Sequence, residues 1–133
     1  MPGQGPGEPP RRDRRALGRY GEELAERYLR RQGFRILARN VHLRHAELDL
    51  IALEGTTLCF IEVRTRSSHR FGSGAESVDR RKRRRIVRAA AEVLATRRLP
   101  HHDDLRFDVV SIHLGAVPAR VELIRDAFRT EDT

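Results

Sequence analysis

Apolar side chains recur along the chain at two different spacings, and each spacing predicts a different element. Residues 16–32 and 79–98 carry apolar positions every three or four residues, as one face of a helix requires; Gly33 ends the first helix and Asp79 caps the second. Five shorter segments have the apolar alternation or run of a strand, namely 34–40, 47–53, 57–64, 105–114 and 121–124. The buried stripe of the second helix is expected to comprise Ile86, Ala89, Ala90, Val93 and Leu94. This order of elements predicts a single α/β domain with a central mixed β-sheet flanked by helices.

Two polar segments lie outside these elements. Residues 1–10 hold four prolines and three glycines, and no large apolar side chain beyond Met1, so they cannot offset the entropy lost on ordering. We therefore expect residues 1–15 to form a disordered basic tail and residues 16–133 to form the folded domain. A stretch rich in serine and glycine, residues 65–74, is predicted to be a loop after the third strand.

A short predicted hairpin brings two acidic residues together. If Gly55-Thr56 is a two-residue turn, with glycine supplying the first positive φ of a type II′ geometry, Glu54 faces Thr57. Counting outward gives the further pairs Leu53–Leu58, Ile51–Phe60, Asp49–Glu62 and Glu47–Arg64. Directly opposed residues have Cβ atoms roughly 4.5–5.5 Å apart on one face of the sheet. The register therefore predicts that the carboxylates of Asp49 and Glu62 lie side by side, with Arg64 next to them.

Two neighbouring carboxylates repel each other unless positive charge lies between them. Mg²⁺ is usually held by one or two carboxylates together with water and phosphate oxygens, so the pair predicts a site for Mg²⁺ or Mn²⁺. The alternative is that Asp49 and Glu62 are solvated residues on an exposed sheet face. Glu22 borders the buried stripe of the first helix and could reach the pair as a third acid. An indirect contact, or a salt bridge to Arg64, is the alternative role for Glu22.

The charge of the chain adds nucleic acid as a candidate partner. The formal net charge is +8, and Lys82 is the only lysine among the 27 basic residues. Such an excess attracts polyanions over long distances. The densest basic run opens the second helix, where the helix dipole is also positive, which suits an anion-binding surface. Residues expected to contact a nucleic-acid backbone are Arg66, Arg80, Arg81, Lys82, Arg83, Arg84, Arg85 and Arg88. A solvated helix face is the alternative; DNA is favoured over RNA, and a homodimer remains open.

Other features narrow the class of protein. Cys59 is the only cysteine, which excludes an internal disulfide and fits a reducing compartment; we expect it to be an inert core thiol. No segment approaches the roughly 18 consecutive apolar residues of a membrane helix, and the N-terminus lacks the apolar stretch of a signal peptide. We therefore expect a soluble, cytoplasmic protein with no membrane partner. Asp108 lies inside an apolar strand and is expected to make a structural hydrogen bond rather than to act in catalysis.

Seven segments carry motifs of a known family. They are Gly-Glu-Glu-Leu-Ala at 21–25, Gly-Phe-Arg-Ile-Leu-Ala-Arg-Asn at 33–40, Ala-Glu-Leu-Asp-Leu-Ile-Ala at 46–52, Phe-Ile-Glu-Val-Arg-Thr-Arg at 60–66, Ala-Glu-Ser-Val-Asp at 75–79, Arg-Phe-Asp-Val-Val at 106–110 and Ile-Arg-Asp-Ala-Phe at 124–128. In this order, and covering everything after about Arg15, they resemble the YraN-like family. That family looks like a branch of the restriction-endonuclease-like superfamily and is similar to archaeal Holliday-junction resolvases. The resemblance implies a mixed sheet flanked by helices and a metal-dependent PD-(D/E)xK site.

The resemblance also implies roles for individual residues. Asp49 matches the motif aspartate, Glu62 the second motif acid and Glu22 the helix acid often found beside them, all three as metal ligands. The motif lysine is replaced by Arg64, which can stabilise developing negative charge but stays protonated and cannot act as a base; a bound metal itself lowers the pKa of water. Ala46 stands where the family usually has glycine, which affects only a local turn. The implied activity is Mg²⁺- or Mn²⁺-dependent endonuclease cleavage of DNA, with branched and single-stranded DNA as candidate substrates. The alternative is a non-catalytic nucleic-acid-binding module with a degenerate nuclease site.

Overall fold

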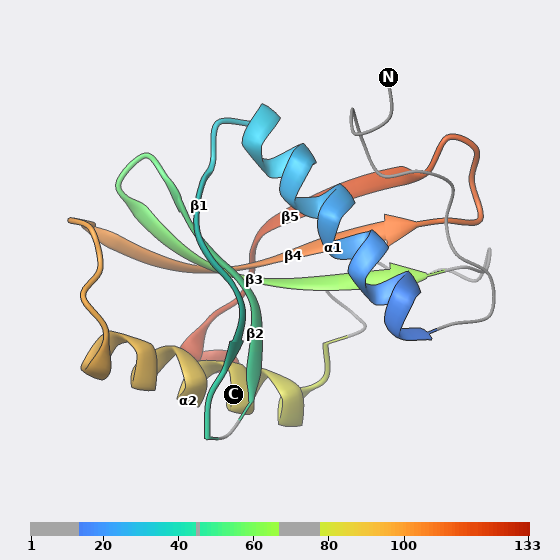
Figure 1. The fold of residues 1–133 in the computed structure, drawn as a ribbon. Coiled ribbons are helices and arrows are strands. Elements are labelled where there is room, and N and C mark those ends of the chain that lie inside the picture. Colours follow the sequence, from blue (N-terminus) through green and yellow to red (C-terminus); the bar gives the residue numbers. More distant parts are fainter. Residues whose placement is uncertain (1–13, 45, 67–77) are drawn as a thin grey trace.

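Two helices and a five-stranded sheet form the core of the computed structural model, which describes residues 14–44, 46–66 and 78–133 (Figure 1). In chain order the elements are α1 (Arg14–Arg31), β1 (Arg35–His42), β2 (Glu47–Glu54), β3 (Thr57–Arg66), α2 (Arg80–Thr96), β4 (Asp104–His113), β5 (Arg120–Phe128) and the short 3₁₀ helix η2 (Thr130–Asp132). The predicted single α/β domain with a mixed sheet is confirmed. The predicted disordered tail lies outside the described residues except for its last two, which belong to α1.

β3 and β5 extend well beyond the residues that the sequence pattern predicts. β3 continues through Thr65 and Arg66, which the pattern assigns to a loop, because β4 runs beside it and supplies pairing partners as far as His113. The rest of that predicted loop lies outside the described residues. β5 extends to Phe128 because it pairs with β4 as far as Phe107. Both extensions depend on contacts between distant segments, which the local pattern does not contain.

The strands lie in the order β1-β2-β3-β4-β5, and every neighbouring pair is antiparallel except β3 and β4. α2 lies in the crossover between these two parallel strands. In the hairpin of β2 and β3, the predicted register is confirmed for the pairs Glu54–Thr57, Leu53–Leu58 and Ile51–Phe60. Gly55 has a φ of 61°, the positive value that the first position of a type II′ turn requires.

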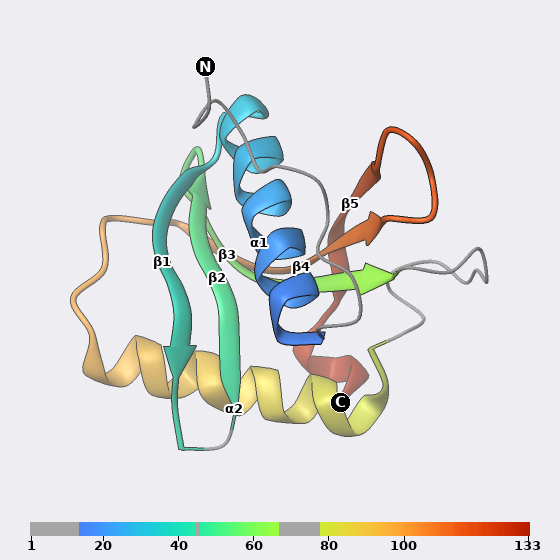
Figure 2. The ribbon, with the colours of Figure 1, turned by 45° about the vertical axis from the view of Figure 1, so that its right-hand side comes forward.

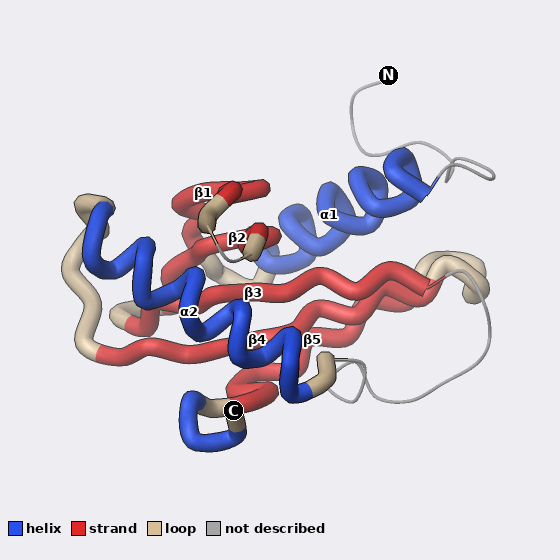
Figure 3. Tube along the Cα trace, turned by 90° about the horizontal axis from the view of Figure 1, so that it is seen from below, coloured by secondary structure: helices blue, strands red, loops and turns tan. Residues whose placement is uncertain are grey.

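The two long helices cover opposite faces of the sheet (Figures 2 and 3). Ala25 and Leu29 of α1 pack in one apolar cluster with Leu50 and Ile61 of the hairpin. On the other face, the buried residues of α2 are Ile86, Ala89, Ala90 and Val93. Leu94, predicted in the same stripe, is instead 38% exposed. It lines a cavity of about 620 Å³ beside β4 and η2, so it lacks the close packing of its neighbours.

The start of α2 is fixed by a capping residue, as predicted. The side chain of Asp79 accepts a hydrogen bond of 2.8 Å from the backbone N–H of Lys82. This cap places Lys82 in the first turn, four residues before the buried Ile86, so the two side chains lie on the same side of the helix. Among the described residues, no helix is long and apolar enough to cross a membrane.

Candidate functional site

The strands of the hairpin part at the predicted acidic pair. The ladder between β2 and β3 ends at Leu50 and Ile61, and the next position along each strand is Asp49 and Glu62. There the backbone N–H of Val63 donates to Asp49 Oδ2 at 2.8 Å, so a side chain of β2 takes over from the backbone ladder. The side chains of Asp49 and Glu62 line the same pocket, and the negative charge of Glu62 contributes to the raised pKa of Asp49. The structure therefore brings together the two acids that the register places side by side.

The predicted pair of Glu47 and Arg64 does not form, because the strands have already parted at this point. Arg64 instead turns back along its own strand, where Arg64 Nη1 lies 3.6 Å from Glu62 Oε2. Glu47 Oε2 lies 3.5 Å from Nδ1 of His42 on the neighbouring strand. The arginine is thus beside the acidic pair as predicted, but through Glu62 and not through Glu47.

A pocket of about 380 Å³ opens where the strands part. Both helices contribute to it, because α1 approaches from one face of the sheet and α2 from the other. Its charged walls include Glu22, Asp49, Glu62, Arg64, Lys82 and Arg85. The larger cavity beside Leu94 contains none of the predicted site residues. The smaller, polar pocket is therefore the candidate site.

Burial and mutual repulsion leave the acids of the pocket under electrostatic strain. Burial, followed by the charge of Glu62, raises the pKa of Asp49 to about 8. Burial also raises the pKa of Glu22, a shift opposed by a hydrogen bond from the Asn40 side chain and reinforced by Glu47 and Glu62. Because repulsion between ionised carboxylates is relieved by a cation, the pocket favours positive charge next to Asp49.

The pocket already holds a cation, Lys82, that the sequence pattern predicts to lie on the nucleic-acid-binding surface. Lys82 Nζ lies 2.5 Å from Glu62 Oε2, and the Glu62 side chain is only 6% exposed. Lys82 was predicted to contact a nucleic-acid backbone as one of a basic run, yet its side chain points to the acidic pair. One signal in the sequence distinguishes it: it is the single lysine in a chain that otherwise uses arginine.

Gly21 is a second residue whose role the sequence did not reveal. It is buried in α1, and a Cβ atom added to it would overlap the side chain of Thr65 on β3. The missing side chain lets α1 approach β3 closely, which brings the adjacent Glu22 to the pocket. Among the described residues, however, no group of three or more His, Cys, Asp or Glu side chains is placed to hold a metal ion. Glu22 thus adds negative charge to the pocket without completing a three-ligand cluster.

The arginines of the predicted nucleic-acid surface divide into two groups. Arg83 has a structural role: its Nε donates to the carbonyl of Val78 at 2.8 Å, and its guanidinium lies 5.7 Å from the centre of the Phe128 ring. Arg85 lines the acidic pocket, and Arg88 lines the adjoining surface of α2. The exposed arginines of the run are Arg80, Arg81, Arg84, Arg85 and Arg88. Arg66, also predicted to bind nucleic acid, is partly buried at the end of β3.

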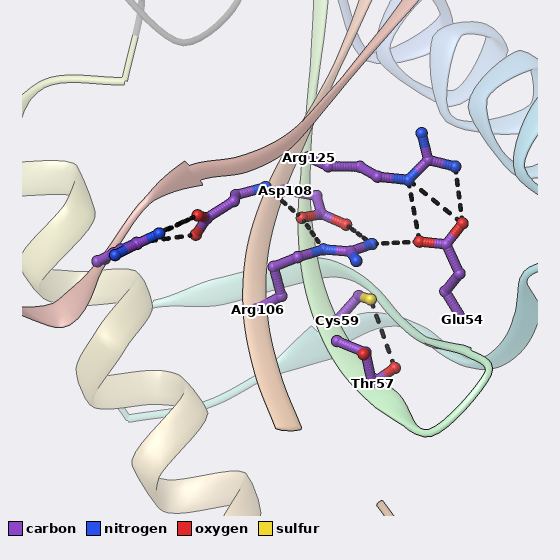
Figure 4. A network of polar contacts seen from close by, with 8 residues as sticks. Glu54, Thr57, Cys59, Arg106, Asp108 and Arg125 are labelled. Atoms are coloured by element: carbon purple, nitrogen blue, oxygen red, sulfur yellow. Dashed lines mark hydrogen bonds and ion pairs between the residues drawn. The ribbon is translucent and has the colours of Figure 1, made fainter. Parts of the chain in front are cut away.

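A separate polar network stabilises the far end of the hairpin (Figure 4). Asp108 is fully buried and accepts from Arg106 Nε at 2.7 Å, from Arg106 Nη2 at 2.9 Å and from the Asp126 backbone N–H at 2.9 Å. Arg106 also donates to Glu54 at the end of β2. The predicted structural role of Asp108 is confirmed. Burial raises the pKa of the nearby Cys59 to about 12, which makes it an unreactive thiol, as predicted.

Comparison with known proteins identifies the family. The model of "Uncharacterised protein family UPF0102" matches residues 21–112, a segment that holds both strands of the hairpin and all of α2. The chain belongs to the UPF0102 family. A UPF0102 protein of Frankia alni is 51% identical over 115 residues, covering 85% of this chain and 94% of the relative. A UPF0102 protein of Chlorobium chlorochromatii is 46% identical over 121 residues, covering 86% and 92%.

A relative from a third organism is similar over a shorter segment. A UPF0102 protein of Vibrio cholerae is 46% identical over 100 residues, covering 74% of this chain and 82% of the relative. These matches confirm the YraN-like resemblance at the level of the family. Gly21, Glu22, Asp49, Glu62 and Lys82 all fall within the segment that defines UPF0102 proteins.

Proposed function

We propose that this UPF0102 protein is a metal-dependent nuclease of the PD-(D/E)xK type that hydrolyses DNA phosphodiester bonds at the acidic pocket. One observation carries the proposal: Asp49 and Glu62 are held side by side in a partly buried pocket, with the pKa of Asp49 raised to about 8. Holding two acids in this way costs stability unless a cation joins them, so the arrangement suits a metal better than it suits a purely structural role.

The donor set fits Mg²⁺ or Mn²⁺. Two carboxylates are enough for Mg²⁺, which completes its coordination with water and phosphate oxygens and rarely uses an all-protein cage. When bound, the metal supplies Lewis acidity and lowers the pKa of a coordinated water. Glu22 adds negative charge at the pocket wall, and the Val63 N–H fixes the orientation of the Asp49 carboxylate.

The cations of the pocket serve the substrate. Arg64 lies next to Glu62, where its guanidinium can stabilise the negative charge that develops on phosphate during hydrolysis. The exposed arginines of α2 continue the positive surface away from the pocket, with Arg85 at the pocket wall and Arg88 one turn further on. Few aromatic residues accompany them, so contacts to the sugar-phosphate backbone explain binding better than base stacking does.

The test is cleavage of DNA by the purified protein. Single-stranded, duplex and branched DNA are incubated with Mg²⁺, with Mn²⁺ and with EDTA, and the products are separated on denaturing gels. Cleavage is expected with metal only, and Asp49→Ala and Glu62→Gln are expected to abolish it. Glu47→Gln is the matched control, because it removes an exposed carboxylate from the same strand and pocket. If neither the natural chain nor Arg64→Lys cleaves any of these substrates, the nuclease proposal is wrong.

The second candidate function is a non-catalytic nucleic-acid-binding module. The observation that favours it is Arg64 at the position of the motif lysine, since arginine cannot act as a base. Such a protein would bind DNA with the salt dependence of phosphate contacts. The two functions differ in the cleavage assay, where a binding module leaves all three DNA substrates intact even when metal is present.

A further inference from the structure

The acidic pocket contains a cation of its own at the position where the proposed metal would be needed. Lys82 Nζ lies 2.5 Å from Glu62 Oε2, whereas Arg64 Nη1 is 3.6 Å from the same oxygen. A carboxylate as deeply buried as that of Glu62 requires a positive partner, and Lys82 is the nearer one. In the metal-free protein the lysine therefore supplies the charge compensation that a divalent ion would otherwise give.

The placement of Lys82 is built into the fold. The cap at Asp79 fixes the first turn of α2, and Ile86, four residues on, is buried against the sheet and lines the same pocket. The Lys82 side chain thus extends from the buried side of the helix to the carboxylate. Its own exposure is 40%, so the ammonium is at the edge of the pocket and has solvent beside it.

Lysine is suited to leave such a position, and arginine is not. Its ammonium is a compact charge on a flexible four-carbon stem, whereas a guanidinium forms a planar fork that is held by two parallel hydrogen bonds. A lysine can exchange one oxygen partner for another by rotating its stem. Within the described basic run of residues 80–85, which is otherwise all arginine, the lysine is the residue that forms an ion pair with the buried acid.

We propose that Lys82 is a displaceable cation. In the metal-free protein its ammonium forms an ion pair with Glu62. When a divalent metal binds, the lysine gives up this carboxylate, and its charge then stabilises the substrate phosphate. This inference rests on the proposed metal-dependent function and adds to it a competition between lysine and metal. Lys82, from α2, also gives the pocket a lysine, whereas the position of the motif lysine on β3 is taken by Arg64. A salt bridge that only joins α2 to β3 would add stability and would have no reason to yield to a metal.

The competition is measured without DNA, by titrating Mn²⁺ into the full-length metal-free protein in a calorimeter. Lys82→Gln removes the competitor and is expected to bind Mn²⁺ roughly tenfold more tightly than the natural chain, a change between the small contribution of an exposed ion pair and the larger one of a fully buried pair. Arg85→Gln is the matched control: it removes one positive charge from the same pocket wall, and its smaller effect measures the long-range contribution alone. Lys82→Met, which keeps an apolar stem, guards against a folding defect in the first variant.

The outcomes separate the inference from the proposed function. Tighter Mn²⁺ binding by both Lys82 variants than by Arg85→Gln, combined with slower cleavage of DNA, supports a displaceable cation. Unchanged or weaker Mn²⁺ binding by the Lys82 variants overturns it, while metal-dependent cleavage by the natural chain would leave the proposed function standing. If neither the natural chain nor Lys82→Gln binds Mn²⁺, the metal site itself is absent and both proposals fail.

Discussion

Gly21 of α1 lies against Thr65 of β3 so closely that no Cβ atom fits between them. This contact sets the distance between the helix and the strand at the edge of the acidic pocket. The close contact between Gly21 and Thr65 brings Glu22, the next residue of the helix, into the pocket wall. The position of an acid in the candidate site therefore depends on the absence of a side chain one residue earlier.

Gly21→Ala is expected to lower the free energy of unfolding by about 1–3 kcal/mol, because the added methyl group overlaps the Thr65 hydroxyl and forces α1 away from β3. Chemical denaturation followed by circular dichroism measures the loss. The matched control is Gly18→Ala in the same helix, where an added Cβ meets nothing within 4 Å. There the better helix propensity of alanine is expected to raise stability by roughly 0.5–1 kcal/mol.

A double variant tests whether Thr65 is the cause. In Gly21→Ala with Thr65→Ala, the hydroxyl that the new Cβ overlaps is gone, and much of the stability is expected to return. The loss of stability in the double variant should therefore be smaller than the sum of the losses in the two single variants. Equal losses for the two glycine substitutions, or additive effects of Gly21→Ala and Thr65→Ala, would contradict the close contact as the reason.

The raised pKa of Asp49 predicts an unusual dependence of stability on pH. Its carboxyl group has a pKa of about 8 in the folded protein, against 3.8 when unperturbed. Between these values the folded chain keeps a proton that the unfolded chain releases, so the contribution of Asp49 to stability is fully present below pH 3.8 and is lost as pH rises toward 8. The slope is expected to approach about 1.4 kcal/mol per pH unit for this one group.

Asp49→Asn is expected to remove this slope. Asparagine mimics the protonated acid and keeps an oxygen for the Val63 N–H, so the variant should exceed the natural chain in stability by more at pH 8 than at pH 5. Urea denaturation in EDTA across this range measures the difference. Glu54 and Glu26 have lowered pKa values, so their contributions to stability are lost at a lower pH than this range. Glu47→Gln is the control; a Glu47→Gln curve with the same change as Asp49→Asn would contradict the assignment to Asp49.

Local patterns were sufficient to predict the hairpin and its acids. Gly55 and the alternation of side chains in β2 and β3 determine the register, and a slip of one residue would turn every apolar side chain to the wrong face. The position of Lys82 beside Glu62 could not be predicted from local patterns, because it depends on the path of the crossover between β3 and β4. The contact between Gly21 and Thr65 is likewise a matter of how helix and sheet pack. The hairpin was thus predictable because its partners are close in sequence, and the approach of Glu22 was predictable from the helix face that it borders. The packing of α2 against the pocket was not.

Asp108→Ala is expected to destabilise the protein by about 3–5 kcal/mol, because it leaves the Arg106 guanidinium without its buried partner and the Asp126 N–H without an acceptor. Thermal or urea denaturation measures this loss. Arg129→Ala is the control, since it removes the exposed partner of Asp126 and should change stability too little to resolve. At a temperature where Asp108→Ala remains folded, its Mn²⁺ affinity should equal that of the natural chain. A loss of metal binding by the folded variant would show that Asp108 has more than a structural role.

Two arginines of α2, only two residues apart, are expected to behave in opposite ways. Arg83 is engaged with Val78 and Phe128, whereas Arg85 faces the acidic pocket and Arg88 continues the exposed surface. The sequence pattern predicts that the whole basic run forms one nucleic-acid-binding surface. The structure divides it, because a helix presents successive residues to different surroundings.

Arg85→Gln combined with Arg88→Gln is therefore expected to weaken binding to duplex DNA and to reduce the salt dependence of the affinity. Because each phosphate contact contributes a slope of about 0.9 in a plot of log K against log salt, loss of two contacts should lower the slope by roughly 2. Fluorescence anisotropy at several NaCl concentrations measures it. Arg83→Gln should keep the slope of the natural chain and instead lose about 1 kcal/mol of stability with its hydrogen bond. If Arg83→Gln changes the slope more than the double variant does, the division of the basic run is wrong.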